Sequence, residues 1–147
     1  MKQLRLLLVC FATLAVASCS LFNSATSSDP VAMAAGQSCG VAVQGLYSSY
    51  QNTGTINLAN PNDLNNTLVL AGAYTTLKQN KDNKSYKNAF ASGLVASSAG
   101  LITTATANKF IDKLLATSSL GNVNAQNITE TAATAAAVIT LINTLKQ

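Results

Sequence analysis

The chain has 147 residues, which is enough for one domain and an N-terminal targeting segment. Charged residues make up only 10% of it, and its polarity comes instead from Asn, Thr, Ser and Gln, which together number 52. Beyond residue 18 there are seven lysines, five acidic residues and no arginine, which leaves a net charge of +2. Nucleic-acid-binding domains normally carry clustered Arg and Lys with interleaved aromatic residues, so we expect no nucleic-acid partner.

The N-terminus has the features of a secretory signal. Lys2 and Arg5 form a positive n-region, and residues 6–15 form an apolar run of ten. A run of this length fits a secretory signal and is too short for a transmembrane helix, which needs about 20 apolar residues. We therefore predict that residues 1–18 are a signal peptide.

The sequence Val16-Ala17-Ser18-Cys19 follows the apolar run directly. An aliphatic residue, two small residues and a cysteine in this order resemble the lipobox of bacterial lipoproteins. The resemblance implies that a diacylglycerol is attached to the Cys19 sulfur, that the chain is cut before Cys19, and that the new amino group is acylated, for example with palmitate. The motif departs from the commonest lipobox, which has Leu at the position of Val16 and Gly or Ala at that of Ser18.

The same resemblance implies a location. In bacterial lipoproteins an aspartate directly after the cysteine commonly retains the protein in the inner membrane, and this chain has Ser20 there. We therefore expect a cell-envelope protein that is lipid-anchored at Cys19 in the outer membrane, where two or more acyl chains hold a protein stably. The alternative is ordinary secretion, because residues 15–17 also form a small-x-small cleavage site that would release a chain beginning at Ser18.

The part after the cysteine is divided into a tether and a domain. Residues 19–36 are small and polar and are interrupted by Pro30, so they are predicted to be the lipidated N-terminus and a flexible tether. From Gln37 to Gln147 the apolar residues recur at helical spacing, which predicts a helical domain. No segment alternates as a strand does. We therefore predict an all-α fold, a small bundle of about five short helices.

The boundaries of these helices follow from capping residues and glycines. The last helix is preceded by the spacing of a capping box between Asn127 and Glu130. In chain order, the expected boundaries are an end at residues 52–54, a start at Asn60 and Pro61, a start at Ser85, an end at Gly100, an end at Gly121 and a start at Asn127.

Three glycines lie inside predicted helices, at Gly45, Gly72 and Gly93. A glycine inside a helix costs about 0.5–1 kcal/mol relative to alanine, so a compensating interaction is expected. Close approach between helices is the predicted compensation, and the alanine-rich run at residues 132–137 suits such packing.

The sequence offers no recognisable catalytic set. The chain has no His, which removes the commonest general base, the Ser-His-Asp triad and the usual zinc sites. No carboxylate pair shares a helix face, and Gly-rich phosphate loops, CxxC pairs and EF-hand loops are missing from the sequence. We therefore predict a protein that is not an enzyme, with no catalytic, cofactor-binding or metal-binding residues and no cofactor.

Cys39 is the one thiol expected to remain after lipidation and signal removal. It falls on the apolar stripe of the first predicted helix, so the preferred interpretation is a small buried residue. The alternative is an intermolecular disulfide in an oxidising compartment.

Four lysines, Lys78, Lys81, Lys84 and Lys87, recur at every third residue across a predicted polar turn at residues 80–84. On a continuous helix this step spreads them around the cylinder, so we expect ordinary solvated surface. The alternative is a patch for lipid or polysaccharide phosphates. The chain's four tyrosines are expected on core stripes with their hydroxyls at the rim, and stacking on sugars is the alternative.

Together these features predict a lipid-anchored cell-envelope protein that is a non-enzymatic interaction or structural module. Its domain is similar to the many small bacterial lipoproteins of unknown function. The expected partners are the membrane, through the lipid anchor, and either an envelope protein or further copies of the chain. The alternative function is a small-ligand or glycan binder with a pocket between helices.

Overall fold

The computed structural model describes residues 29–123 and 131–146, and every regular element in these ranges is helical. The predicted all-α fold is therefore confirmed. None of the helices in these ranges is long and apolar enough to cross a membrane. The elements in chain order are α2 (Pro30–Thr53), α3 (Pro61–Gln79), α4 (Lys84–Ser97), α5 (Ala107–Ala116), the 3-10 helix η1 (Ser118–Asn122), α6 (Thr131–Asn143) and the 3-10 helix η2 (Thr144–Lys146).

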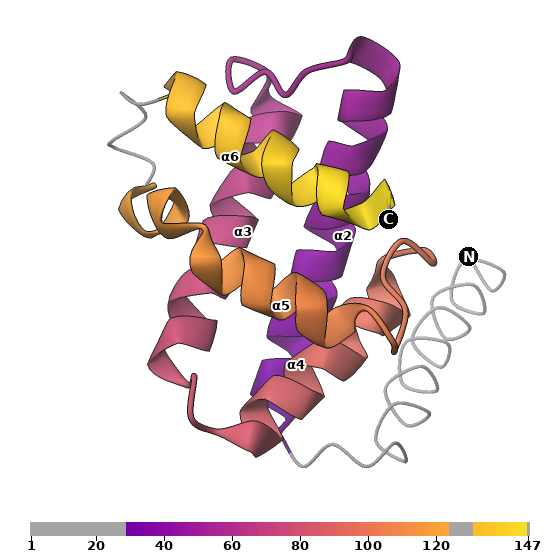
Figure 1. The fold of residues 1–147 in the computed structure, drawn as a ribbon, viewed down its shortest axis with the longest axis vertical. Coiled ribbons are helices and arrows are strands. Elements are labelled where there is room, and N and C mark those ends of the chain that lie inside the picture. Colours follow the sequence, from indigo (N-terminus) through magenta and orange to yellow (C-terminus); the bar gives the residue numbers. More distant parts are fainter. Residues whose placement is uncertain (1–28, 124–130, 147) are drawn as a thin grey trace, which may run out of the picture.

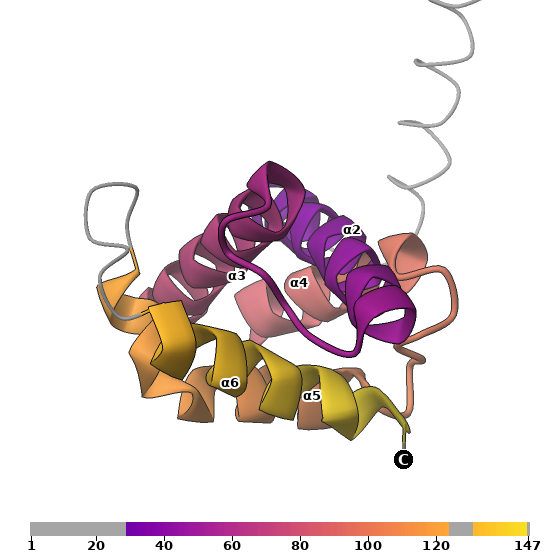
Figure 2. The ribbon, with the colours of Figure 1, turned by 90° about the horizontal axis from the view of Figure 1, so that it is seen from above.

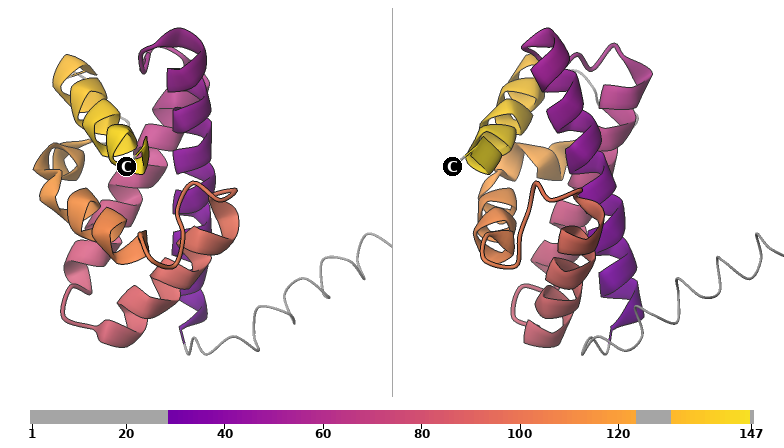
Figure 3. Two further views of the ribbon diagram at one scale, coloured as in Figure 1. Left: turned by 45° about the vertical axis from the view of Figure 1, so that its right-hand side comes forward. Right: turned by 90° about the vertical axis from the view of Figure 1, so that its right-hand side faces the viewer.

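The helices are arranged in two layers. The first consists of α2, α3 and α4, with α2 packed against both of the others (Figure 1). Along the chain, α3 returns antiparallel to α2, and α4 then runs in the same general direction as α2. The helices α5 and α6 form the second layer and cross one face of the first (Figure 2). The side of α2 that is turned away from α5 and α6 has no other described helix over it (Figure 3).

The first described helix begins earlier than the sequence predicts. Asp29 is its N-cap, and its Oδ1 atom accepts a hydrogen bond of 3.0 Å from the backbone N–H of Ala32. Pro30 occupies the first helical position, where a missing N–H costs nothing because that group would be unpaired anyway. The predicted tether is therefore wrong for residues 30–36, and the helical domain starts at Asp29 and not at Gln37.

The next two boundaries were predicted correctly. Gly54 ends α2 in the left-handed conformation with φ 71°, and its N–H donates to the Tyr50 carbonyl oxygen at 2.8 Å. Asn60 caps α3 by accepting a hydrogen bond of 2.9 Å from the N–H of Asn62, and Pro61 takes the first helical position. In both cases the capping residue forms its contacts within a few residues of itself, so these boundaries depend on local chemistry alone.

Other boundaries differ from prediction. Asn83 caps α4 in place of Ser85, because its Oδ1 accepts a hydrogen bond of 3.1 Å from the N–H of Tyr86. The end of α4 is Ser97, before the predicted stop at Gly100. Likewise α5 ends at Ala116, and η1 then continues through the predicted stop at Gly121. The predicted capping box at residues 127–130 lies outside the described residues.

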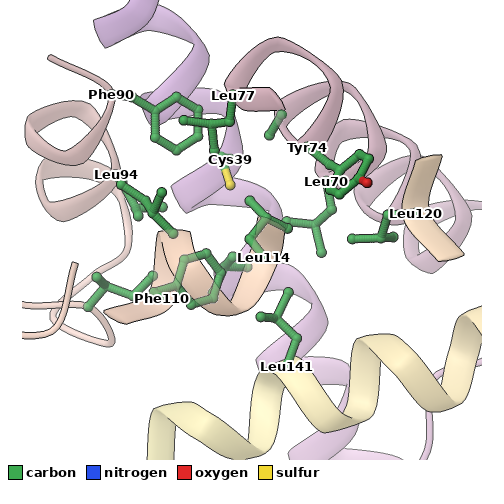
Figure 4. Packing of buried hydrophobic residues seen from close by; sticks show 14 of the residues in the cluster. Cys39, Leu70, Tyr74, Leu77, Phe90, Leu94, Phe110, Leu114, Leu120 and Leu141 are labelled. Carbon is green, nitrogen blue, oxygen red and sulfur yellow. The ribbon is translucent and has the colours of Figure 1, made fainter. Parts of the chain in front are cut away.

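The core lies between the two layers and draws on all five described α-helices. Phe90, Leu94 and Leu114 are completely buried, and Cys39 lies among them near the centre (Figure 4). Close packing of this kind leaves little room for an added methylene group.

Backbone-to-backbone contact joins α2 and α4. A Cβ atom added to Gly93 would overlap the carbonyl oxygen of Met33, and one added to Gly36 would overlap that of Phe90. The prediction of close helix approach is therefore confirmed for Gly93. It is wrong for Gly72, because an added Cβ there would meet no atom within 4 Å. At Gly45 the neighbour is the side chain of Asn66 and not another backbone.

Candidate functional site

The predicted lipidation site, Cys19, lies outside the described residues. Cys19 precedes Asp29, the first described residue, by only ten residues, and this separation limits how far an anchor on Cys19 can lie from the start of α2. An extended chain advances at most about 3.3–3.6 Å per residue, so the Cα atoms of Cys19 and Asp29 cannot be more than about 35 Å apart. A lipid on Cys19 would therefore keep the membrane near the start of α2.

A group of lysines lies at this same end of the bundle. The end of α3, the following turn and the start of α4 all lie at the same end of the bundle as the start of α2 (Figure 1). Three of the four lysines in this region are exposed and the fourth is partly exposed. The acidic residues there are Asp29, which caps α2, and Asp82. We call this region the basic end and define it by Lys78, Lys81, Lys84 and Lys87.

The opposite end of the bundle has a buried carboxylate. The side chain of Asp63 is 3% exposed, and its Oδ2 accepts a hydrogen bond of 2.9 Å from the backbone N–H of Asn57. Asp63 lies in the first turn of α3, where the helix dipole favours a negative charge. The carboxylate thus holds the loop between α2 and α3 against the start of α3, which is a structural role.

The solvent-facing side of α2 carries no charge. None of the helix's 24 residues is charged, and its Val31 and Val41 side chains are 72% and 58% exposed. The cores of protein interfaces are similarly depleted in charged residues. We call the central part of this surface the outer face of α2 and define it by its exposed residues Ala34, Ser38, Val41, Gln44 and Ser48.

An open cavity of about 590 Å³ lies between α4, the segment that follows it and the start of α5. None of its lining side chains is ionisable. Ser92, in its wall, donates a hydrogen bond of 3.0 Å to the Asn88 carbonyl oxygen of its own helix, so that hydroxyl hydrogen is already engaged. The cavity therefore offers neutral polar groups but no acid or base. Its polar lining consists of Ser85, Asn88, Ser92, Thr104 and Asn108.

Cys39 is a free thiol with no exposed surface. Desolvation by burial raises the pKa of its thiol to about 12, so the group stays protonated at neutral pH. The interpretation of Cys39 as a small buried residue is confirmed. The alternative of an intermolecular disulfide is wrong for this fold, because the sulfur does not reach the surface.

The tyrosines belong to the core, as predicted. Tyr74 and Tyr86 are buried, and Tyr47 and Tyr50 are partly buried and pack against the core cluster. All four rings are therefore at least partly covered by the core. Within the residues that the structure describes, no group of three or more Cys, Asp or Glu side chains could hold a metal ion.

Two features were not found from the sequence. The spacing of the lysines is visible in the sequence. Their position at the same end of the bundle as the start of α2 depends on the directions of three helices. The cavity has no sequence signal, because its walls are ordinary small, polar and aliphatic residues with no motif among them. No protein-family model matches the chain, and no curated protein or solved structure is detectably similar to it.

Proposed function

We propose that this protein is a lipid-anchored protein of the cell envelope, held at Cys19 in the outer membrane, and that its helical domain is a non-enzymatic interaction module. The observation that carries the proposal is the lipobox-like sequence ending at Cys19, directly behind an apolar run of ten residues. The early start of the domain at Asp29 supports it, because anchor and domain are then separated only by residues 20–28.

The interaction role is supported by the outer face of α2. A helix of 24 residues with one side in solvent normally carries charged residues on that side, and α2 carries none. Val41 lies in the middle of this face and is 58% exposed. We propose that the face binds another envelope protein or a second copy of the chain.

Metabolic labelling with palmitate tests the anchor. Label should enter the wild-type protein and the Cys10→Ala variant, because Cys10 lies inside the predicted signal peptide. It should not enter Cys19→Ala, which should accumulate as an uncut precursor or an unlipidated form. Incorporation of palmitate into Cys19→Ala would disprove the anchoring proposal.

Site-specific photocrosslinking in living cells tests the interaction role. A photoreactive amino acid at Val41 should give a discrete crosslinked product, whereas one at the exposed Lys113 of α5 should not. A product of twice the protein's mass would identify a second copy, and another discrete mass would identify a different partner. If Val41 gives no more crosslinking than Lys113, the outer face of α2 is not the interaction surface.

The cavity favours a second candidate function, the binding of a small neutral ligand such as a glycan. Its neutral polar lining offers hydrogen bonds to hydroxyl groups, and its volume of about 590 Å³ is in the range of small-ligand sites. Titration with neutral oligosaccharides, followed by amide NMR, should then shift signals of α4 and residues 104–108. Those shifts should be absent in Ser92→Trp, whose indole would fill the cavity. Signals that do not move in the wild-type protein would argue against this function.

A further inference from the structure

We infer that the basic end of the bundle lies against anionic lipid headgroups of the membrane that holds the anchor, and that Lys81, Lys84 and Lys87 thereby orient the domain. This inference rests on the proposed anchoring at Cys19. It is carried by one juxtaposition: the turn between α3 and α4 lies at the same end of the bundle as the start of α2, the described helix nearest to Cys19 in the sequence (Figure 1).

Contacts between α2 and α4 establish part of this juxtaposition. Ser97 bonds to the carbonyl oxygen of Gln37, while Gly93 lies against the backbone of Met33. The two helices therefore run in the same general direction, and the start of α4 lies toward the start of α2. Lys84, the first residue of α4, is for this reason at the Asp29 end of α2.

The direction of α3 brings its last residues to the same end. Gly45 of α2 lies against Asn66 of α3, and the two helices are antiparallel. Lys78 follows Asn66 by twelve residues, while Met33 precedes Gly45 by the same number. Equal steps of about 1.5 Å per residue place Lys78 near the level of Met33.

The charges at this end are unbalanced. Lys81 and Lys84 are exposed and Lys87 is partly exposed, while the Nζ atom of Lys78 lies 5.5 Å from the centroid of the Tyr74 ring. Of the two acidic residues here, Asp29 already accepts a hydrogen bond from the first turn of α2. The opposite end of the bundle, residues 54–66, contains no lysine or arginine. Within residues 29–123 and 131–146, the end that carries Lys78, Lys81, Lys84 and Lys87 is therefore cationic, in contrast to the opposite end.

An exposed apolar side chain accompanies these lysines. Val31, the second residue of α2, is 72% exposed at the basic end. Lysines beside an exposed aliphatic group are the combination by which proteins contact the interface of an anionic bilayer. The outer membrane's lipid headgroups fit this surface better than a soluble polyanion does, because only the bilayer offers an apolar region that Val31 could contact.

Because the proposed anchor already holds the protein at the membrane, a weak attraction between the lysines and the lipid is sufficient to orient the domain. The membrane's surface potential decays over a Debye length of about 8–10 Å, and a lipid on Cys19 would keep Asp29, at the start of the domain, within about 35 Å of the anchor. Each lysine near an anionic surface favours the contacting orientation about fivefold. Two such lysines would therefore change the ratio of contacting to other orientations about 25-fold.

The test uses the mature, lipidated protein in vesicles of phosphatidylcholine with and without phosphatidylglycerol. A fluorophore is attached at Gln79→Cys, beside the basic end, or at Ala59→Cys, at the opposite end; both positions are exposed, and buried Cys39 does not compete for the label. Quenching by a lipid that carries a nitroxide on its headgroup reports which end faces the bilayer. We expect strong quenching at Gln79 and weak quenching at Ala59 when phosphatidylglycerol is present.

Charge variants make the result specific. Lys81→Gln with Lys84→Gln should shift the orientation about 25-fold and remove the excess quenching at Gln79, and added salt should do the same. The matched control, Lys109→Gln with Lys113→Gln on α5, should keep it. Equal quenching at Gln79 and Ala59, or quenching that survives loss of Lys81 and Lys84, would overturn the inference.

Failure of the anchor is distinguished by a separate measurement. Flotation of the protein with vesicles of phosphatidylcholine alone requires the lipid and not the lysines. Flotation without oriented quenching would therefore disprove the inference and leave the anchor intact. If Cys19 carries no lipid, the chain from residue 19 onward is tested by cosedimentation with phosphatidylglycerol vesicles. Salt-sensitive binding that is lost without Lys81 and Lys84 would then still support the basic end as a lipid-binding surface, and no binding would overturn it.

Discussion

The hydroxyl of Ser97 donates a hydrogen bond of 2.8 Å to the carbonyl oxygen of Gln37, a residue sixty positions earlier in the chain. The Ser97 hydroxyl also lies within hydrogen-bond distance of its own helix, 2.9 Å from the carbonyl oxygen of Gly93. A Cβ atom on Gly40 of α2 would overlap this hydroxyl. A small polar residue opposite a glycine thus lets α4 bond directly to the backbone of α2, and several testable consequences concern this packing.

Alanine at two glycines should give opposite effects on stability. Gly93→Ala should lower the free energy of unfolding by about 1–3 kcal/mol or more, because its methyl group would overlap the carbonyl oxygen of Met33 and the helices would have to separate. Gly72→Ala should raise it by about 0.5–1 kcal/mol, because the added methyl group meets no atom within 4 Å and alanine favours the helix. Urea unfolding measures both. Equal destabilisation by the two changes would contradict the close approach of α2 and α4.

Removal of the buried carboxylate should weaken the α2–α3 loop. Asp63→Ala should lower the free energy of unfolding by about 1–3 kcal/mol, because the Asn57 N–H would lose its acceptor. The control is Asp112→Ala on α5, an exposed position where a change within about 0.5 kcal/mol is expected. Thermal unfolding monitored by far-UV circular dichroism compares them. If Asp63→Ala lowers the free energy of unfolding no more than Asp112→Ala does, Asp63 does not hold the loop.

The start of α2 can be checked through its cap. Asp29→Ala should lower the free energy of unfolding by about 0.5–2 kcal/mol, the usual cost of losing an N-cap acceptor. Hydrogen exchange of the Ala32 amide should also become faster, since its partner is gone. An unchanged exchange rate at Ala32 would place the beginning of the helix further along the chain.

Burial of Cys39 predicts a specific loss of stability in alkali. Desolvation raises the pKa of the thiol from its usual value of 9.0 to about 12 in the folded protein. Between these two pH values the unfolded chain loses the thiol proton and the folded chain keeps it, so the free energy of unfolding falls as pH rises. The contribution is at most about 4 kcal/mol and is fully present below pH 9.

The thiol's contribution is isolated as the difference between two proteins that differ only at Cys39. Unfolding of the wild-type protein and of Cys39→Ala is followed as pH is raised above 9.0. The wild-type protein should lose stability more steeply than the variant. Parallel curves would show that the thiol does not titrate differently in the two states.

The structural features predicted from the sequence are those that depend on a few neighbouring residues. Gly54 and the pair Asn60-Pro61 determine helix boundaries through their own dihedral preferences and hydrogen bonds, and both were located correctly. Pro30 was misinterpreted because proline is compatible with a helix start as well as with a tether. The cap of α4 was displaced because Asn83 and Ser85 are both good capping residues, and local sequence does not choose between them.

Features that depend on the relative positions of helices could not be found in this way. Gly72 and Gly93 look alike in the sequence, yet only Gly93 faces another backbone. The basic end exists because two turns reverse the chain and bring the end of α3 and the start of α4, which carry the lysines, to the same end of the bundle as the start of α2. The distribution of charge over the surface therefore follows from topology, whereas the individual charges follow from the sequence.

The packing of α2 against α4 also has a consequence for the order in which the protein can fold. Synthesis produces α2 first, but its partner residue Ser97 is added sixty residues after Gln37. During that interval the uncharged α2 lacks its principal neighbour, and its buried residues, such as Leu46, have only α3 to cover them. Contacts of this sequence separation slow folding and prolong the exposure of apolar surface. The side of α2 that packs against α4 therefore stays uncovered until α4 has been completed.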